Sequence, residues 1–240
     1  MKTIRLSNEV TTDAIDAART MYPSRVALHS LRNGQMIKLG NLSTFYLVVL
    51  SGLAACHFTD EHGDVKAGQP TVIAGPRDYV SGVGAVVEGS SNDLTVVAVF
   101  ERVGFRGQRA FGSVEDKGRL SYIDGCSDTM LVYPPRAGDP VFNHLHFPPG
   151  IVQTQHLHPS IRLGVVLYGK GKAWGPGWEL DLEPGVAFML DEQEIHSFRT
   201  DTSEDVMGVI AYHPDSDWGP VDANHPMLNR TYIRHGGGAR

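Results

Sequence analysis

Apolar residues of this chain gather in short runs, and turn-forming residues separate the runs. Nine runs of four to eight residues are bounded by Gly, Pro, Asp or Asn. Runs of this length and spacing predict β-strands and, together, an all-β sandwich or barrel. The predicted strands are Phe45–Ser51, Thr71–Ala74, Leu94–Glu101, Thr129–Tyr133, Val141–Phe147, Ile151–His158, Leu163–Tyr168, Val186–Leu190 and Val206–Tyr212. One short helix is expected over Thr12–Tyr22, with Thr11 or Thr12 as its cap and Pro23 at its end.

The chain also repeats itself weakly. The segment Val48–Gly52 matches Val165–Gly169 at an offset of 117 positions, and the same offset places Gly68 on Gly185. Two anchors at one offset favour a duplicated domain, although glycine-bounded strands also resemble one another by chance. We therefore expect an N-terminal domain over residues 1–110 and a C-terminal domain over residues 111–240.

Histidines provide the clearest candidate chemistry. His156 and His158 are two residues apart, a spacing that points both rings to one face of a β-strand. His196 follows a later apolar run. Three neutral imidazoles that converge from two strands form a first-row metal site with coordination positions left open. At the offset of the repeat, the three histidines correspond to Leu39, Asn41 and Tyr79, so we expect one metal ion per chain, in the C-terminal copy.

The residues around these histidines resemble the two motifs of the cupin superfamily. The first motif has a glycine, five residues, His-x-His and a later glycine, and Gly150, His156, His158 and Gly169 stand at those positions. The second has a Pro-Gly turn, a strand and a histidine, which Pro184-Gly185 and His196 match. The resemblance implies two tandem jelly-roll barrels, a bicupin, and it covers the N-terminal half only through the repeat.

One position departs from the cupin pattern. The first motif ordinarily continues with a glutamate that ligates the metal, and Arg162 replaces it here. A guanidinium cannot ligate a metal and stays charged at physiological pH, so the resemblance implies a three-histidine site. If the strand is regular, Arg162 faces the metal cavity, where its charge requires an anion. That anion is either a substrate carboxylate, which would make Arg162 a catalytic-site residue, or an acidic side chain of the protein.

Further residues are candidates for a substrate pocket because they share the orientation of a histidine ligand or neighbour it in sequence. They are Thr154, Ser160, His146, Phe188 and Phe198. For the two phenylalanines, packing in the core is the more common role, and the pocket wall is the alternative. His144 and His146 form a second His-x-His pair, which lacks the spacing of the first motif from a glycine. We expect one of these rings to support a metal ligand or to line the pocket, rather than the pair to bind a second metal ion.

Composition narrows the class of protein. The formal net charge is -6 and no basic patch offsets it, which argues against nucleic-acid binding. Two cysteines in unlike contexts favour a reduced, cytoplasmic setting over a disulfide scaffold. No apolar run reaches the length of a membrane span, and the N-terminus lacks an apolar signal core. The expected partners are therefore a small molecule and, since bicupins often pair, a second copy of the chain.

These observations lead to a metal-dependent enzyme acting on a small anionic molecule, one that carries a carboxylate. Three neutral ligands leave the charge of a divalent metal intact, and up to three coordination positions remain for substrate and dioxygen. The resemblance favours an Fe(II) dioxygenase, whereas three histidines suit Zn, Ni, Mn or Cu as well. The alternatives are a non-redox isomerase or lyase, in which the metal is a Lewis acid, and a non-catalytic small-molecule-binding cupin.

Overall fold

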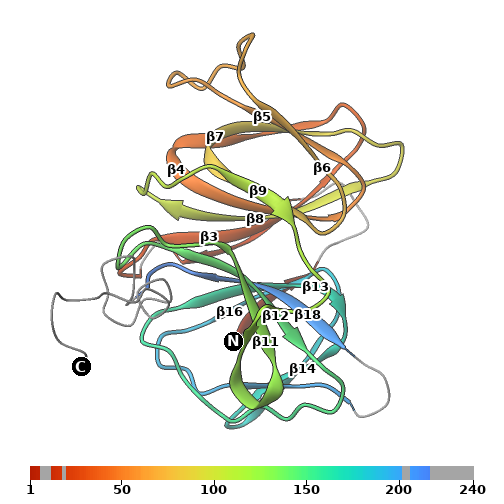
Figure 1. Ribbon diagram of the computed structural model, residues 1–240, viewed down its shortest axis with the longest axis vertical. Helices are drawn as coiled ribbons and strands as arrows, with labels where there is room; N and C mark the ends of the chain where they lie inside the picture. The colour runs from red at the N-terminus through yellow and green to blue at the C-terminus, as the bar shows by residue number, and fades with distance from the viewer. Residues whose placement is uncertain (6–11, 18–19, 202–205, 217–240) are drawn as a thin grey trace, which may run out of the picture.

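The computed structural model describes residues 1–5, 12–17, 20–201 and 206–216. It is all-β, as predicted, with two main sheets stacked one above the other (Figure 1). Among the described residues, the one helical element is a single 3-10 turn, η1 (Ile123–Gly125). No helix in this part of the chain is long and apolar enough to cross a bilayer.

The upper sheet in Figure 1 is built from the N-terminal half of the chain and has eight antiparallel strands. Seven of them follow one another across the sheet in the order β2 (Thr12–Ala17), β3 (Ser24–Leu31), β8 (Thr95–Val103), β4 (Met36–Ser51), β7 (Asp78–Gly89), β5 (Ala54–Phe58) and β6 (Thr71–Ala74). The eighth, β9 (Ala110–Ser113), pairs with β7.

The lower half contains a sheet of seven strands and a sheet of three. The larger sheet has the order β1 (Lys2–Arg5), β16 (Val186–Leu190), β13 (Arg162–Gly169), β18 (Met207–His213), β12 (Val141–Phe147), β11 (Ser127–Val132) and β10 (Leu120–Ser121). The smaller sheet has the order β15 (Trp178–Leu182), β14 (Gly171–Gly175) and β17 (Ser197–Arg199). Apolar residues of both, among them Phe147, Phe188 and Phe198, form one buried cluster.

A second apolar cluster joins the two halves of the molecule. Phe142 of β12 is fully buried, and its ring centroid lies 5.5 Å from that of Tyr46 and 5.5 Å from that of Phe100 in the upper sheet. Tyr212 of β18 stacks on Phe100 at 5.9 Å. Because these rings come from both halves, the hydrophobic free energy of the cluster is available only when the two sheets are packed together.

The expected helix over Thr12–Tyr22 is wrong. Its described first part is strand β2, which pairs with β3 so that Ile15 lies opposite Val26. Ile15 and Ala17 are buried while their neighbours in the strand are exposed, a period of two rather than 3.6. Contacts with β3 therefore decide the conformation of a segment whose local capping residues suit a helix equally well.

Two strands cross the predicted division of the chain at residue 110. β1, at the very start of the chain, pairs with β16 in the lower half, where Figure 1 also shows the N-terminus. The predicted boundary between residues 110 and 111 falls within β9, which belongs to the upper sheet. The division into residues 1–110 and 111–240 itself stays a prediction.

The repeat is visible in the strand pairing, with one anchor corrected. The amide of Gly185 donates to the carbonyl oxygen of Val166 at 3.0 Å, and the amide of Arg77 donates to that of Val49 at 2.8 Å. Arg77 is therefore the counterpart of Gly185, and both have a positive φ, of 70° and 83°. Gly68 is not the counterpart of Gly185. The reason is that the β5–β6 connection of the N-terminal half is longer than the β14–β15 connection of the C-terminal half. The alignment of the residues that follow this connection is therefore shifted.

The same shift corrects the counterpart of His196. His156 and His196 lie opposite one another in an isolated antiparallel bridge, and Leu39, the counterpart of His156, lies opposite Ala85. Ala85, not Tyr79, therefore occupies the place of His196. Leu39 and Ala85 are buried in an apolar cluster of the upper sheet. Aliphatic side chains thus pack in the N-terminal half where imidazoles meet in the C-terminal half.

Candidate functional site

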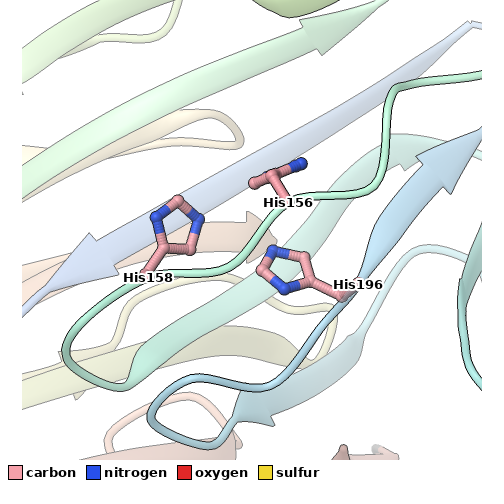
Figure 2. Close-up of side chains that lie close together, drawn as sticks. All are labelled: His156, His158 and His196. Carbon is pink, nitrogen blue, oxygen red and sulfur yellow. The ribbon is translucent and has the colours of Figure 1, made fainter.

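The three predicted metal ligands converge. Figure 2 shows the rings of His156, His158 and His196 turned toward one another from two segments of the chain. One nitrogen from each ring lies within 4.8 Å of the others. The ring centroids of His156 and His196 are 4.5 Å apart, and each lies 5.1 Å from that of His158. Three imidazoles at this separation could hold one metal ion.

The segment that carries His156 and His158 is not the predicted strand. Ile151–His158 contains only isolated bridges, at Val152 and His156, and runs as a loop into β13. Two backbone hydrogen bonds, of 3.0 and 2.9 Å, nevertheless join His156 to His196 just before β17. This long-range pairing, rather than the alternation of a strand, places the two parts of the motif side by side.

Backbone carbonyls orient two of the rings. The Nδ1 atom of His156 lies 2.8 Å from the carbonyl oxygen of Thr154, and the Nδ1 atom of His196 lies 2.8 Å from that of Glu194. A carbonyl only accepts, so each Nδ1 carries the proton and each Nε2 keeps its lone pair. A fixed tautomer with a free Nε2 is the form in which imidazole ligates a metal.

Burial keeps His158 and His196 in the neutral form. Desolvation, together with the charge of Arg162 and the neighbouring histidines, lowers the pKa of His158 to about 3. Desolvation likewise lowers the pKa of His196 to about 4, although its hydrogen bond to Glu194 works in the opposite direction. Because only neutral imidazole donates a lone pair, the rings are ready for a metal at neutral pH. The chemistry of the donor set therefore fits a divalent first-row metal.

The ligands open into a narrow hollow of about 30 Å³, which we call the histidine hollow. Its wall is mostly apolar and comes from both sheets of the lower half. Beside the three histidines it is lined by Tyr122, Leu145, Phe147, Gln153, Arg162, Leu163, Phe188, Leu190, Phe198, Val209, Ala211 and His213. A wider hollow of about 410 Å³, the side hollow, shares Tyr122, His158, Arg162 and His213 with it. The side hollow is large enough for a small organic molecule, and His158 is the metal ligand that lines it.

Arg162 lies at the junction of the two hollows. Its Nη1 atom donates to the carbonyl oxygens of Ser160 and Ile161, at 3.1 and 2.9 Å, and to the Ser160 hydroxyl, at 2.6 Å. The same atom is 3.9 Å from Asp215, which also accepts a hydrogen bond from Ser160. Both predicted environments of Arg162 are therefore present: it faces the metal cavity and it has an acidic neighbour.

The predicted pocket residues divide into two groups. Phe188 and Phe198 line the histidine hollow. Thr154 and Ser160 do not line it, because the loop that carries them lacks the strand alternation on which their placement rested. His146 does not line it either: Leu145 and Phe147 of β12 face the hollow, so His146, between them, faces the opposite side, where its Nδ1 atom is 3.2 Å from the Tyr168 hydroxyl.

Three polar residues of the wall were missed from the sequence. Gln153 is buried beside the ligands, Tyr122 precedes η1, and His213 ends β18. His213 had a recognisable signal, since Val209, Ala211 and His213 share one face of a strand and all three line the hollow. Its ring centroid is 6.2 Å from that of His158, and burial lowers its pKa well below the usual range. No comparable signal marks Gln153 or Tyr122, which are placed by loops.

We expect one tightly bound metal ion per chain. Leu39 and Ala85 fill the place of His156 and His196 in the N-terminal half, and neither offers a lone pair. Metal analysis of protein loaded with Zn(II) and then dialysed against a weak chelator would measure the ratio. Two tight equivalents would contradict the prediction, and His144→Ala would then show whether the second His-x-His pair binds the additional ion.

No protein-family model and no curated protein sequence matches the chain. Solved structures do match. A cupin 2 conserved barrel domain protein from Leptotrichia buccalis superposes with a TM-score of 0.59 at 17% identity, over 88% of this chain and 95% of that chain. An oxalate decarboxylase from Bacillus subtilis with Mn(II) centres gives 0.58 at 10% identity, over 90% and 75%. A salicylate 1,2-dioxygenase from Pseudoaminobacter salicylatoxidans in complex with gentisate gives 0.59 at 10% identity, over 83% and 73%.

Identities this low establish the fold and leave the reaction open, since the two enzymes among these structures catalyse different chemistry. The fold agrees with what the two motifs around His156, His158 and His196 imply. The two main sheets match what is expected of a bicupin. The chain therefore has the cupin fold, with a three-histidine cluster that could hold a metal in its C-terminal half.

Proposed function

We propose that this protein is a metal-dependent cupin enzyme, an Fe(II) dioxygenase whose substrate is a small organic carboxylate. One observation carries the proposal: three neutral imidazoles converge where a cationic side chain, Arg162, enters the same hollow. Neutral ligands leave the charge of a divalent metal uncompensated, so metal and guanidinium together favour an anion.

His156, His158 and His196 would hold the metal, which when bound supplies a Lewis-acidic centre and, if it is iron, redox chemistry toward dioxygen. The protein's own residues do the remaining work. The carbonyls of Thr154 and Glu194 hold two rings in the ligating tautomer. Phe188 and Phe198 limit the access of water to the ligands.

Arg162 is the residue we assign to the substrate carboxylate. Its side chain is only 13% exposed, so water screens its charge weakly. Asp215 lies 3.9 Å from the guanidinium, a distance beyond a direct hydrogen bond. A carboxylate in the side hollow would compete with Asp215 for the guanidinium.

Two other functions use the same residues. A non-redox isomerase or lyase would use the metal as a Lewis acid alone, and the similarity to an oxalate decarboxylase is as strong as that to a dioxygenase. A non-catalytic cupin would bind the carboxylate without turnover. We favour the dioxygenase because three protein ligands leave room for substrate and dioxygen together.

Oxygen consumption decides among these functions. Protein loaded with Fe(II) under nitrogen would be mixed with a panel of aromatic and aliphatic carboxylates, salicylate and gentisate first, and then exposed to ¹⁸O-labelled dioxygen. The proposal predicts oxygen uptake and two labelled oxygen atoms in the product. Conversion without oxygen uptake would point to an isomerase or lyase. Saturable binding without conversion of any ligand would point to a binding protein.

Arg162→Leu is expected to weaken carboxylate binding and to leave the metal bound. A charge-assisted hydrogen bond contributes about 1.5–3 kcal/mol, so the affinity for a carboxylate should fall roughly ten- to a hundredfold. Arg162→Lys should restore it only in part, because an ammonium group lacks the planar fork. Titration calorimetry on Zn(II)-loaded protein would measure both variants.

Arg119→Leu is the matched control, because Arg119 is exposed, pairs with Glu115 and lines neither hollow. A structural role for Arg162, through Ser160 and Asp215, makes a different prediction: the melting temperature would fall and carboxylate affinity would not change. That result would remove the main reason for proposing an anionic substrate.

A further inference from the structure

The side hollow has a second polar wall across from Arg162. Asn143 of β12 and Asp128 of β11 both line it. The Asn143 amide donates to the Asp128 carboxylate at 3.0 Å. The side chain of Asn143 is buried, with the residue only 2% exposed.

Each of these side chains has an acceptor without a donor. The Oδ1 atoms of Asn143 and of Asp128 are buried and accept no hydrogen bond from any described residue. Exchanging the oxygen and nitrogen positions of the Asn143 amide would not satisfy these acceptors, because it would place the amide oxygen against the Asp128 carboxylate. An unpaired buried acceptor destabilises the free protein, and a ligand that donates to it removes that cost. Desolvation also raises the pKa of Asp128 to about 6, despite the hydrogen bond from Asn143.

The strand order sets the distance between this wall and Arg162. Arg162 begins β13, Asn143 lies in β12, and β18 separates the two strands. Two strand spacings amount to about 10 Å between backbones, and side chains project from both strands into the hollow. His158 and His213 line the hollow as well. A ligand that reaches both walls therefore spans only a few carbon atoms and lies beside a metal ligand.

We propose that the substrate is bipolar: a carboxylate at Arg162 and, a few carbon atoms away, a hydroxyl or amino group that donates to Asn143 and Asp128. The inference rests on the proposed function, which supplies the carboxylate, and it adds the second group. It makes Asn143 and Asp128 specificity-determining residues. A ligand with a methyl group in place of the donor would leave both acceptors unpaired.

The test compares ligands that differ only at the far end. Butanoate, 4-hydroxybutanoate and 4-aminobutanoate would be titrated into full-length, Zn(II)-loaded protein, which binds ligands without oxidising them. We expect the hydroxy and amino compounds to bind about tenfold or more tightly than butanoate, since hydrogen bonds to a charged acceptor have that effect. Equal affinity for all three would overturn the inference.

Two variants locate the effect. Asn143→Leu removes one acceptor, and Asp128→Asn keeps the shape of the side chain and removes its charge. Both should reduce the preference for 4-hydroxybutanoate to a fewfold or less, with the affinity for butanoate unchanged. Asp93→Asn, in a loop of the other half, is the matched control and should keep the full preference. If Asn143→Leu fails to fold, Asp128→Asn alone still decides.

Failure of this inference is distinguishable from failure of the proposed function. If butanoate binds wild-type protein and Arg162→Leu weakens it, the carboxylate site stands, whatever the far end does. If no carboxylate binds the metal-loaded protein, the proposed function fails first. A preference that persists in both Asn143→Leu and Asp128→Asn would assign the donor to another part of the hollow and would overturn the inference.

Discussion

Replacing His196 with alanine is expected to remove the metal and, with it, nearly all activity. Outer partners of metal ligands already change metal affinity by 10–100-fold, so loss of a ligand itself should cost at least about a hundredfold. Two histidines then remain, His156 and His158, on one loop. Metal content after dialysis and oxygen uptake with Fe(II) would measure the loss.

The fold should survive this change. The backbone of residue 196 keeps both hydrogen bonds to His156, at 3.0 and 2.9 Å, whatever its side chain. The apolar cluster behind the site is unaffected. A circular dichroism spectrum close to that of wild type is expected. His62→Ala is the control, because His62 is exposed in the N-terminal half and should keep full metal binding. Full metal occupancy in His196→Ala would show that the second motif is misassigned.

Phe142→Ala is expected to lower the free energy of unfolding by about 3–5 kcal/mol, the usual cost of removing a buried aromatic ring. Phe142 is fully buried, and its ring contacts Tyr46, Tyr79 and Phe100 of the upper sheet. The cavity left behind would lie between the two halves, whose backbones are held apart by the remaining rings. Urea unfolding followed by fluorescence would measure the change.

Phe111→Ala is the comparison, because Phe111 is 63% exposed and its truncation should change stability by less than about 0.5 kcal/mol. Metal binding per folded molecule should be unaffected in both variants, since Phe142 does not line the histidine hollow. A loss below about 1 kcal/mol in Phe142→Ala would contradict the view that this aromatic cluster joins the two halves.

Strands whose ends are marked by turn residues could be predicted from the sequence. Val141–Phe147, Val186–Leu190 and Thr71–Ala74 are strands with the predicted limits, and a Gly or Pro immediately precedes each of them. Ile151–His158 is not a strand, although it has the expected length. Its backbone bonds go to residues around His196, more than thirty positions away, and no local pattern reports such partners.

By itself, the sequence determined which side chains can ligate a metal and that the chain folds into turn-separated strands. Both follow from residue type and spacing, which are local properties. Only the tertiary structure decided what surrounds the metal ligands. Three features depend on strand register. They are the face of β12 that lines the hollow, the placement of Asn143 and Arg162 across from each other, and the correspondence of Ala85 rather than Tyr79 to His196. Register is set by pairing between distant segments, because only that pairing buries the apolar faces together.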